Sequence, residues 1–181
     1  MIFTPTTLAG SFVIDISAFK DNRGWFARTY CKNEFQQIGH SKEWVQLNHS
    51  VTFQKGSLRG MHYQLPPFRE TKMVRCIAGA VYDVIVDLRI SSPTFLQWFS
   101  AELSVDNKKM LYIPEGFAHG FQALTDNCEL LYHHTEFYTP GAEAGVRYND
   151  PIIDIKWPLA VTEISDRDAA HPLLDTNFKG V

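Results

Sequence analysis

Apolar and polar residues alternate with a period of two over much of the chain. The pattern is clearest over residues 81–89, VYDVIVDLR, where β-branched residues recur, as is typical of a strand. One face of this strand is apolar and the other is mixed, because it carries Asp83 and Asp87. A mixed face is typical of a cavity lining, although a solvent-facing strand surface is more common and has the same pattern.

Five further stretches have the composition of strands, with turn residues between them. They are residues 44–52, 72–79, 96–104, 109–114 and 129–138. Short strands at nearly regular intervals predict an all-β fold, a sandwich or a barrel of the jelly-roll kind. Helix is expected only over residues 32–39, which end on Gly39, and over 165–171, where Ser165 is the expected N-cap. Without repeats or linkers, residues 1–181 are expected to form a single domain.

The composition excludes several classes of protein. Hydrophobic residues make up 45% and charged residues 20% of the 181 residues, and the net charge of -3 argues against a nucleic-acid partner. No apolar run approaches the ~18 residues that span a bilayer, and the start, MIFTPTTLAGSF, does not resemble a signal peptide. The odd count of cysteines, Cys31, Cys76 and Cys128, predicts reduced thiols and a cytoplasmic location.

Residues 59–72, RGMHYQLPPFRETK, gather four basic side chains around a glycine and a double proline. Arg59, His62 and Lys72 have few apolar neighbours in this stretch. A surface loop between strands has this composition, and so does a site that binds an anion and moves a proton.

Two stretches resemble the sequence motifs of the cupin barrel, a double-stranded β-helix. Gly56 precedes His62 at the first motif, and residues 114–119, PEGFAH, match P-x-G-x-x-H with His119 at the end. A metal-binding cupin normally carries H-x-H in the first motif, whereas this chain has His62-Tyr63-Gln64. The adjacent histidines 133 and 134 do not replace the missing ligand, because neighbouring strand residues point to opposite faces. We therefore expect a cupin-type barrel with no metal and no other cofactor.

Taken together, the motifs resemble one family over nearly the whole chain. The matching segments are DNRGWF (21–26), QLNHS (46–50), LRGMHYQ (58–64), Lys72, GAVYDVIVDLR (79–89), SPT (92–94), IPEGFAHGF (113–121), Tyr132, Tyr138, NDP (149–151), WP (157–158) and SDRD (165–168). They resemble the dTDP-4-dehydrorhamnose 3,5-epimerase (RmlC) family of nucleotide-sugar epimerases. The resemblance implies a jelly-roll barrel, usually a homodimer, that needs no metal and binds a nucleoside-diphosphate sugar oxidised to a ketone at C4.

The resemblance also implies a set of catalytic residues. Loss of a proton from C3 or C5, next to the ketone, gives an enolate, so inversion needs a base on one face of the sugar and an acid on the other. By resemblance His62 is the base, Asp168 fixes its tautomer and Tyr132 is the acid. Lys72 is expected to stabilise the C4 oxyanion, and Asp83 to orient Lys72 by an ion pair.

The same resemblance implies the residues that bind the rest of the substrate. Guanidinium groups bind phosphate bidentately, an amide face suits the nucleotide, and an aromatic ring can pack on the base. The expected contacts are Arg23, Arg59 and Arg167 with the diphosphate, Gln46, Asn48 and Phe26 with the nucleotide, His119 with the sugar, and Tyr138 with the sugar carbons.

Two departures from the family pattern leave alternatives open. Arg28 stands where the family usually has glutamate near the base, and His133 where a lysine is common. Both departures concern the identity of the nucleotide and of the inverted carbons more than the acid-base residues. The alternatives are a C3-only or C5-only epimerase, a CDP- or GDP-linked substrate, a nucleotide-sugar 3,4-ketoisomerase, a non-catalytic sugar-binding cupin, and a metal-dependent cupin oxygenase. The presence of a base, an acid and a dyad carboxylate favours the epimerase.

Overall fold

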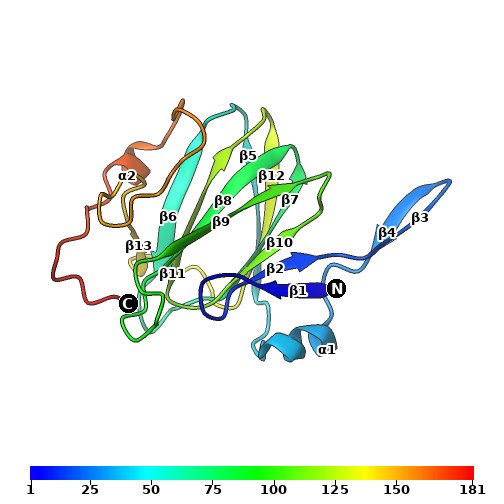
Figure 1. The fold of residues 1–181 in the computed structure, drawn as a ribbon, viewed down its shortest axis with the longest axis horizontal. Coiled ribbons are helices and arrows are strands. Elements are labelled where there is room, and N and C mark those ends of the chain that lie inside the picture. The colour runs from blue at the N-terminus through cyan, green and yellow to red at the C-terminus, as the bar shows by residue number, and fades with distance from the viewer.

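The computed structural model describes residues 1–181, and its regular secondary structure is almost entirely antiparallel β-strand (Figure 1). A six-stranded sheet has the order β1-β2-β10-β7-β12-β5, a five-stranded sheet has the order β13-β6-β11-β8-β9, and β3 and β4 form a separate hairpin. The strands are β1 (Ile2–Pro5), β2 (Phe12–Asp15), β3 (Ala18–Asp21), β4 (Gly24–Ala27), β5 (Gln46–Thr52), β6 (Leu58–Gln64), β7 (Lys72–Ala78), β8 (Ala80–Asp87), β9 (Trp98–Ser104), β10 (Met110–Ile113), β11 (Phe117–Ala123), β12 (Cys128–His134) and β13 (Glu143–Gly145).

The two large sheets face each other and enclose the main core. Val74 and Leu130 come from the six-stranded sheet, Ile85 and Phe121 from the five-stranded sheet, and all four belong to one buried cluster. This arrangement confirms the predicted all-β jelly-roll barrel. The three cysteines are free thiols, as expected.

Strand β8 is buried on both of its faces. Val81 and Ile85 pack between the sheets, whereas Val84 and Val86 pack on the outer side. Asp83 is 0% exposed, so the solvent-facing interpretation of this strand is wrong. The outer side is covered by the chain after β13, including Ile153 and Ile155 (Figure 1).

The helices are short and lie where the sequence predicts them. Helix α1 (Lys32–Phe35) and the 3-10 helix η1 (Gln36–Ile38) end at Gly39, whose φ of 79° is readily adopted only by residues such as glycine. Helix α2 (Asp166–Ala169) is capped by Ser165, whose Oγ accepts the Asp168 amide hydrogen at 3.2 Å. None of the helices is both long enough and apolar enough to cross a membrane.

The stretch RGMHYQLPPFRETK is not one continuous loop. Its first half forms strand β6, and only residues 65–71 connect this strand to β7. Strand β6 lies beside β11, and the two backbones approach closely at Gly60 and Gly120. A Cβ on Gly60 would lie 2.5 Å from the Gly120 Cα. Arg59 and His62 are therefore held by a sheet, not by a flexible connection.

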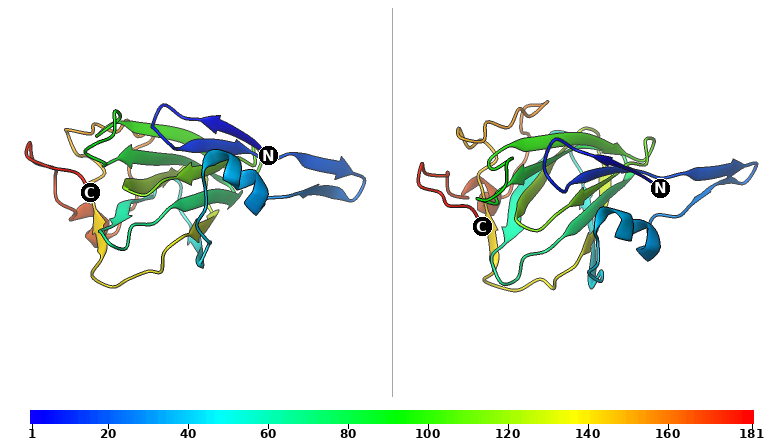
Figure 2. Two further views of the ribbon diagram at one scale, coloured as in Figure 1. Left: turned by 90° about the horizontal axis from the view of Figure 1, so that it is seen from below. Right: turned by 60° about the horizontal axis from the view of Figure 1, so that its bottom comes forward.

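The β3–β4 hairpin projects away from the barrel (Figures 1 and 2). Its aromatic side chains Phe19, Trp25 and Phe26 are exposed.

The strand predicted over residues 129–138 is shorter in the structure, where β12 ends at His134. The backbone carbonyl of His134 accepts the Val45 amide hydrogen at 2.8 Å.

Candidate active site

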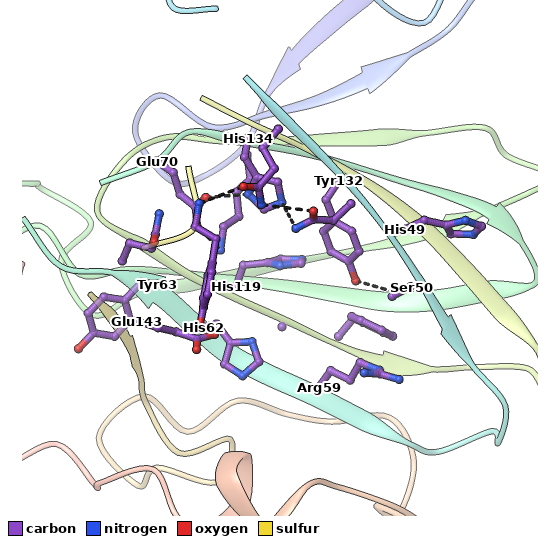
Figure 3. Close-up of a pocket in the computed structure, with 17 residues that line it drawn as sticks. His49, Ser50, Arg59, His62, Tyr63, Glu70, His119, Tyr132, His134 and Glu143 are labelled. Atoms are coloured by element: carbon purple, nitrogen blue, oxygen red, sulfur yellow. Dashed lines mark hydrogen bonds and ion pairs between the residues drawn. The ribbon is translucent and has the colours of Figure 1, made fainter. Parts of the chain in front are cut away.

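A cavity of about 260 Å³ opens between the two sheets and is lined mainly by polar side chains (Figure 3). Its walls come from β5, β7 and β12 on one side and from β6 and β11 on the other. The cavity explains Asp83 on the mixed face of β8, because Asp83 supports the lining residue His119 from behind. Asp87 on the same face instead accepts hydrogen bonds from the loop after β8.

His62 and Asp168 form a hydrogen-bonded pair at the edge of the cavity. His62 Nε2 lies 2.8 Å from Asp168 Oδ1, and the Gly60 amide donates to Asp168 Oδ2 at 3.0 Å. Burial raises the pKa of Asp168, but hydrogen bonds from His62, Gly60 and Arg167 outweigh burial and hold that pKa well below its usual range. The ionised carboxylate keeps the proton of His62 on Nε2, which leaves the Nδ1 lone pair able to accept another proton.

His119 and Asp83 form a second, more deeply buried pair. His119 Nε2 lies 3.0 Å from both carboxylate oxygens of Asp83, and His119 is directly opposite His62 on the paired strands β11 and β6. Burial raises the pKa of Asp83, and the charge and hydrogen bond of His119 oppose that rise.

The predicted ion pair between Asp83 and Lys72 is wrong. Lys72 Nζ instead contacts Glu70 Oε1 at 2.9 Å. Both oxygens of Asp83 are occupied by His119, and Glu70 lies just before β7, which carries Lys72. The charge of Lys72 nevertheless opposes the rise that burial causes in the pKa of Asp83.

Tyr132 stands on the opposite wall from His62. It belongs to β12 of the six-stranded sheet, whereas His62 belongs to β6 of the five-stranded sheet. The Tyr132 hydroxyl hydrogen-bonds to Ser50 Oγ at 3.0 Å, and its ring lies 6.1 Å from that of His119. Burial raises the pKa of the Tyr132 phenol well above its ordinary value, so the hydroxyl keeps its proton at neutral pH.

Four of the predicted substrate contacts also line the cavity. Gln46, Asn48, Arg59 and Tyr138 lie around it. Arg59 is held in place from β5, because its Nε donates to Thr52 Oγ1 at 3.1 Å and its Nη2 to the Val51 carbonyl at 3.0 Å. Arg167 lines an adjoining cavity that shares Arg59 and His62 with the first.

Three predicted contacts lie outside the cavity of their own chain. Arg23 and Phe26 are on the projecting hairpin, where Arg23 pairs with Asp21 at 2.6 Å and 90% of its side chain is exposed. Arg28 follows the hairpin and pairs with Glu34 at 3.0 Å. The hairpin projects away from the barrel, so these side chains do not reach the cavity of their own chain (Figure 1).

Glu70 and His134 are among the cavity residues that were not predicted from the sequence. Glu70 lies in the connection between β6 and β7, and its spacing of two residues from Lys72 was an available signal. His134 was considered only as a metal ligand. The prediction that the adjacent histidines diverge is confirmed, because His134 lines the cavity while the His133 ring packs 5.9 Å from that of Trp44.

One group of side chains has ligand atoms close enough to hold a metal ion. The group consists of His62, Asp168 and His171, whose ligand atoms lie within 4.8 Å of one another. The guanidinium of Arg167 already contacts two of them, with Nε 3.2 Å from Asp168 Oδ1 and Nη2 3.2 Å from His62 Nε2. A second cation there would meet repulsion from Arg167, so this donor set suits proton transfer better than metal binding.

The fold and the cavity define a jelly-roll barrel with titratable side chains on both of its inner walls. Comparison with known proteins identifies the family. The family model described as dTDP-4-dehydrorhamnose 3,5-epimerase matches residues 5–176. The curated dTDP-4-dehydrorhamnose 3,5-epimerase of Salmonella typhimurium is 44% identical over 177 residues, which cover 97% of this chain and 96% of that one.

Two solved structures have the same fold at high similarity. The Bacillus anthracis dTDP-4-dehydrorhamnose 3,5-epimerase, with TDP and PPi bound, has a TM-score of 0.92 and 38% identity, covering 96% of this chain and 99% of that one. The Legionella pneumophila enzyme, in complex with dTDP-4-keto-L-rhamnose, has a TM-score of 0.90 and 38% identity, covering 95% and 92%. The chain belongs to the dTDP-4-dehydrorhamnose 3,5-epimerase family, a family of isomerases.

Proposed function

We propose that the chain inverts C3 and C5 of dTDP-4-dehydro-6-deoxyglucose without a metal or other cofactor. The observation that carries this proposal is the position of the His62–Asp168 pair and Tyr132 on opposite walls of one cavity. A sugar ring between the walls would have a base on one face and an acid on the other, which is what inversion at a carbon next to a ketone requires.

In the proposed mechanism His62 removes the proton and Tyr132 returns one from the other side. His62 Nδ1 accepts the proton from the carbon next to the ketone, and Asp168 stabilises the imidazolium that results. The electrons of the broken C–H bond form the enolate, and the Tyr132 hydroxyl then protonates the opposite face of the carbon. Proton exchange with solvent restores both groups, and the same sequence serves C3 and C5.

Lys72 stabilises the enolate oxygen in this proposal. Its ammonium group lies in the cavity wall with a side chain only 10% exposed, so water weakens its field little. A preorganised cation next to the developing negative charge lowers the barrier to enolisation. His119, held by Asp83, contacts the sugar from the β11 side.

Arg59, Gln46 and Asn48 bind the nucleoside diphosphate, with Tyr138 over the sugar. Arg167 reaches the diphosphate from the adjoining cavity. The relatives described above hold TDP with PPi and dTDP-4-keto-L-rhamnose, and a thymidine nucleotide is therefore the base that we propose here.

We also propose a cytoplasmic homodimer of single-domain chains, with no membrane or nucleic-acid partner. Two apolar features support a second copy: the hairpin with exposed Phe26, and the edge strand β5, on which Leu47 is 63% exposed. Exposed apolar edges tend to pair with another chain. In such a dimer Arg23 and Phe26 would serve the partner's cavity, which would explain why they lie far from their own.

The test is turnover of 4-keto-6-deoxyglucose linked to dTDP, CDP or GDP, followed by NMR of the C3 and C5 configuration. The proposal predicts inversion at both carbons and a clear preference for the dTDP sugar. Inversion at one carbon would establish a single-site epimerase, and a preference for CDP or GDP would assign base selection to Arg28. Elemental analysis of the active enzyme is expected to find less than stoichiometric metal, and stoichiometric iron would contradict the proposal.

A further inference from the structure

Glu70 and His134 are two buried titratable residues of the cavity that the proposed mechanism does not use. His134 Nδ1 lies 2.7 Å from Glu70 Oε2, and the other oxygen of Glu70 accepts from Lys72 Nζ at 2.9 Å (Figure 3). The three side chains are only 9–10% exposed. On the sheet His134 is directly opposite Lys72 on one side and Gln46 on the other.

The direction of each hydrogen bond in this cluster follows from a backbone amide. The Tyr138 N–H donates to Gln46 Oε1 at 3.0 Å, and this contact fixes the orientation of the Gln46 amide. Gln46 Nε2 then donates to Asn48 Oδ1 at 3.3 Å, and Asn48 Nδ2 is left to donate to His134 Nε2 at 3.3 Å.

The chain of bonds fixes the tautomer of His134. Because Nε2 accepts from Asn48, the proton of the neutral ring must be on Nδ1, where it is donated to Glu70. A second proton on Nε2 would point at the NH₂ group of Asn48. The side-chain amides of Asn48 and Gln46 would then both have to flip, and the hydrogen bond from the Tyr138 backbone to Gln46 would be lost.

We propose that His134 and Glu70 are positioning residues that hold the Lys72 ammonium toward the substrate ketone. This inference rests on the proposed function, because Lys72 acts on the enolate only if the chain is an epimerase. Glu70 fixes the ammonium in place, and His134 fixes Glu70. The bond network continues to Gln46 and Asn48, so it joins the nucleotide end of the cavity to the oxyanion end.

The ionisation of Glu70 is consistent with this role. Burial raises the pKa of Glu70, but the hydrogen bond from His134 and the charge of Lys72 outweigh burial and lower that pKa overall. The other titratable groups nearby include Tyr132, whose ring is stacked 6.2 Å from that of His134, and the adjacent His133, whose pKa is lowered by burial and in part by His134. Asp83 on β8 hydrogen-bonds to His119, and the charge of Lys72 opposes the rise that burial causes in its pKa.

The first test needs no substrate and therefore does not depend on the proposed function. Imidazole ¹⁵N NMR of the ligand-free protein is expected to show the Nδ1–H tautomer of His134, with a resonance that shifts in the Glu70→Gln variant. An Nε2–H tautomer, or a resonance that Glu70→Gln leaves in place, would overturn the network whether or not the protein is an epimerase.

The second test is a matched pair of variants. His134→Asn keeps an N–H where imidazole Nδ1 stands, whereas His134→Leu has similar bulk and no donor. His134→Leu is expected to lower kcat by about 10- to 100-fold, the usual effect of losing a hydrogen bond to a charged group. KM should stay within a few-fold, and the acidic limb of the kcat profile should move to higher pH, because Glu70 loses the donor that lowers its pKa.

His134→Asn is expected to recover most of the rate and the wild-type acidic limb. Equal losses in the two variants, or a loss confined to KM, would overturn the positioning role. Failure of the wild-type protein to turn over any nucleotide ketosugar would instead refute the proposed function, with the NMR result still deciding the network.

Discussion

The two histidines at the centre of the cavity have the same kind of partner but different surroundings. The side chain of His62 is 23% exposed beside Asp168, whereas that of His119 is 6% exposed beside a fully buried Asp83. A base must exchange its proton with solvent after each turnover, and only His62 has that access. In the proposed mechanism His119 therefore holds the sugar and His62 is the base.

This difference predicts different kinetic defects. His62→Asn is expected to lower kcat by about 10²- to 10⁴-fold, the usual range for loss of a general base. His119→Asn should mainly raise KM, because a binding contact is lost. Steady-state kinetics on both variants, with circular dichroism as the folding control, measures this. A kcat of His62→Asn within a few-fold of wild type would refute the assignment of the base.

Tyr132→Phe separates proton removal from proton return. The variant keeps His62, so it should still exchange substrate protons with solvent, while inversion falls by about 100-fold or more. NMR in deuterated buffer measures exchange and inversion in one experiment. Wild-type inversion by Tyr132→Phe would show that another group is the acid. Because burial raises the pKa of Tyr132, a basic limb of the wild-type profile below pH ~10 should not come from this phenol.

The three strands of one cavity wall, β5, β7 and β12, were predictable from sequence, whereas β6 and β11 of the opposite wall were not. The β-branched run of β8 and the polar face of β5 identified both strands, and Gly39 and Ser165 identified the helix boundaries. Strand β6 escaped the pattern because Arg59 and His62 interrupt its apolar positions. Apolar and polar residues alternate along a strand when one face meets the apolar core and the other meets solvent. A strand that lines a polar cavity has polar residues on its inner face as well, so this alternation is lost.

The candidate site was predictable as a list of residues but not as a set of contacts. The resemblance placed Asp168 with His62, and the structure brings the two together. The two-residue spacing of Glu70 and Lys72 permits their contact, but the sequence does not decide between Glu70 and Asp83 as the partner of Lys72, because the choice depends on how β7 and β8 lie in the fold. The direction of the β3–β4 hairpin is likewise set by three-dimensional packing, and it places Arg23 far from the cavity of its own chain.

The close approach of β6 and β11 leads to a prediction about substitution of Gly60. This residue has a φ of 133°, and its added Cβ would lie 2.5 Å from the Gly120 Cα. Gly60→Ala should therefore separate the strands, displace the amide that donates to Asp168, and reduce kcat as well as the melting temperature. Gly141→Ala is the matched control, because its φ is also positive and no atom lies within 4 Å of the added Cβ. Equal effects of the two changes would refute the account.

The hydrogen bonds that join Asp168 of α2 to Gly60 and His62 of β6 lead to a prediction about stability in acid. The folded-state pKa of Asp168 lies below the unfolded value of about 3.9, so this carboxylate stabilises the fold above that pH and the contribution is lost as pH falls below it. Asp168→Asn should therefore be destabilised relative to wild type at pH 7, and the difference should shrink below pH ~4. Urea unfolding at several pH values measures this. A difference that grows on acidification would contradict the sign.

The whole molecule is predicted to act as a dimer through its exposed apolar edges. Leu47→Glu on β5 should shift the protein to monomers in analytical ultracentrifugation and lower activity, because each cavity would lose the partner's Arg23 and Phe26. Ile152→Glu is the control, since Ile152 is 41% exposed outside these edges. A wild-type protein that is monomeric and fully active would contradict this prediction.

The measurement that tests the central claim most directly is deuterium incorporation into dTDP-4-keto-6-deoxyglucose in deuterated buffer, followed by NMR. The account predicts deuterium at both C3 and C5 with the wild-type protein and at neither carbon with His62→Asn. Deuterium incorporation by His62→Asn at the wild-type rate, or none by the wild-type protein with any nucleotide ketosugar, would contradict it.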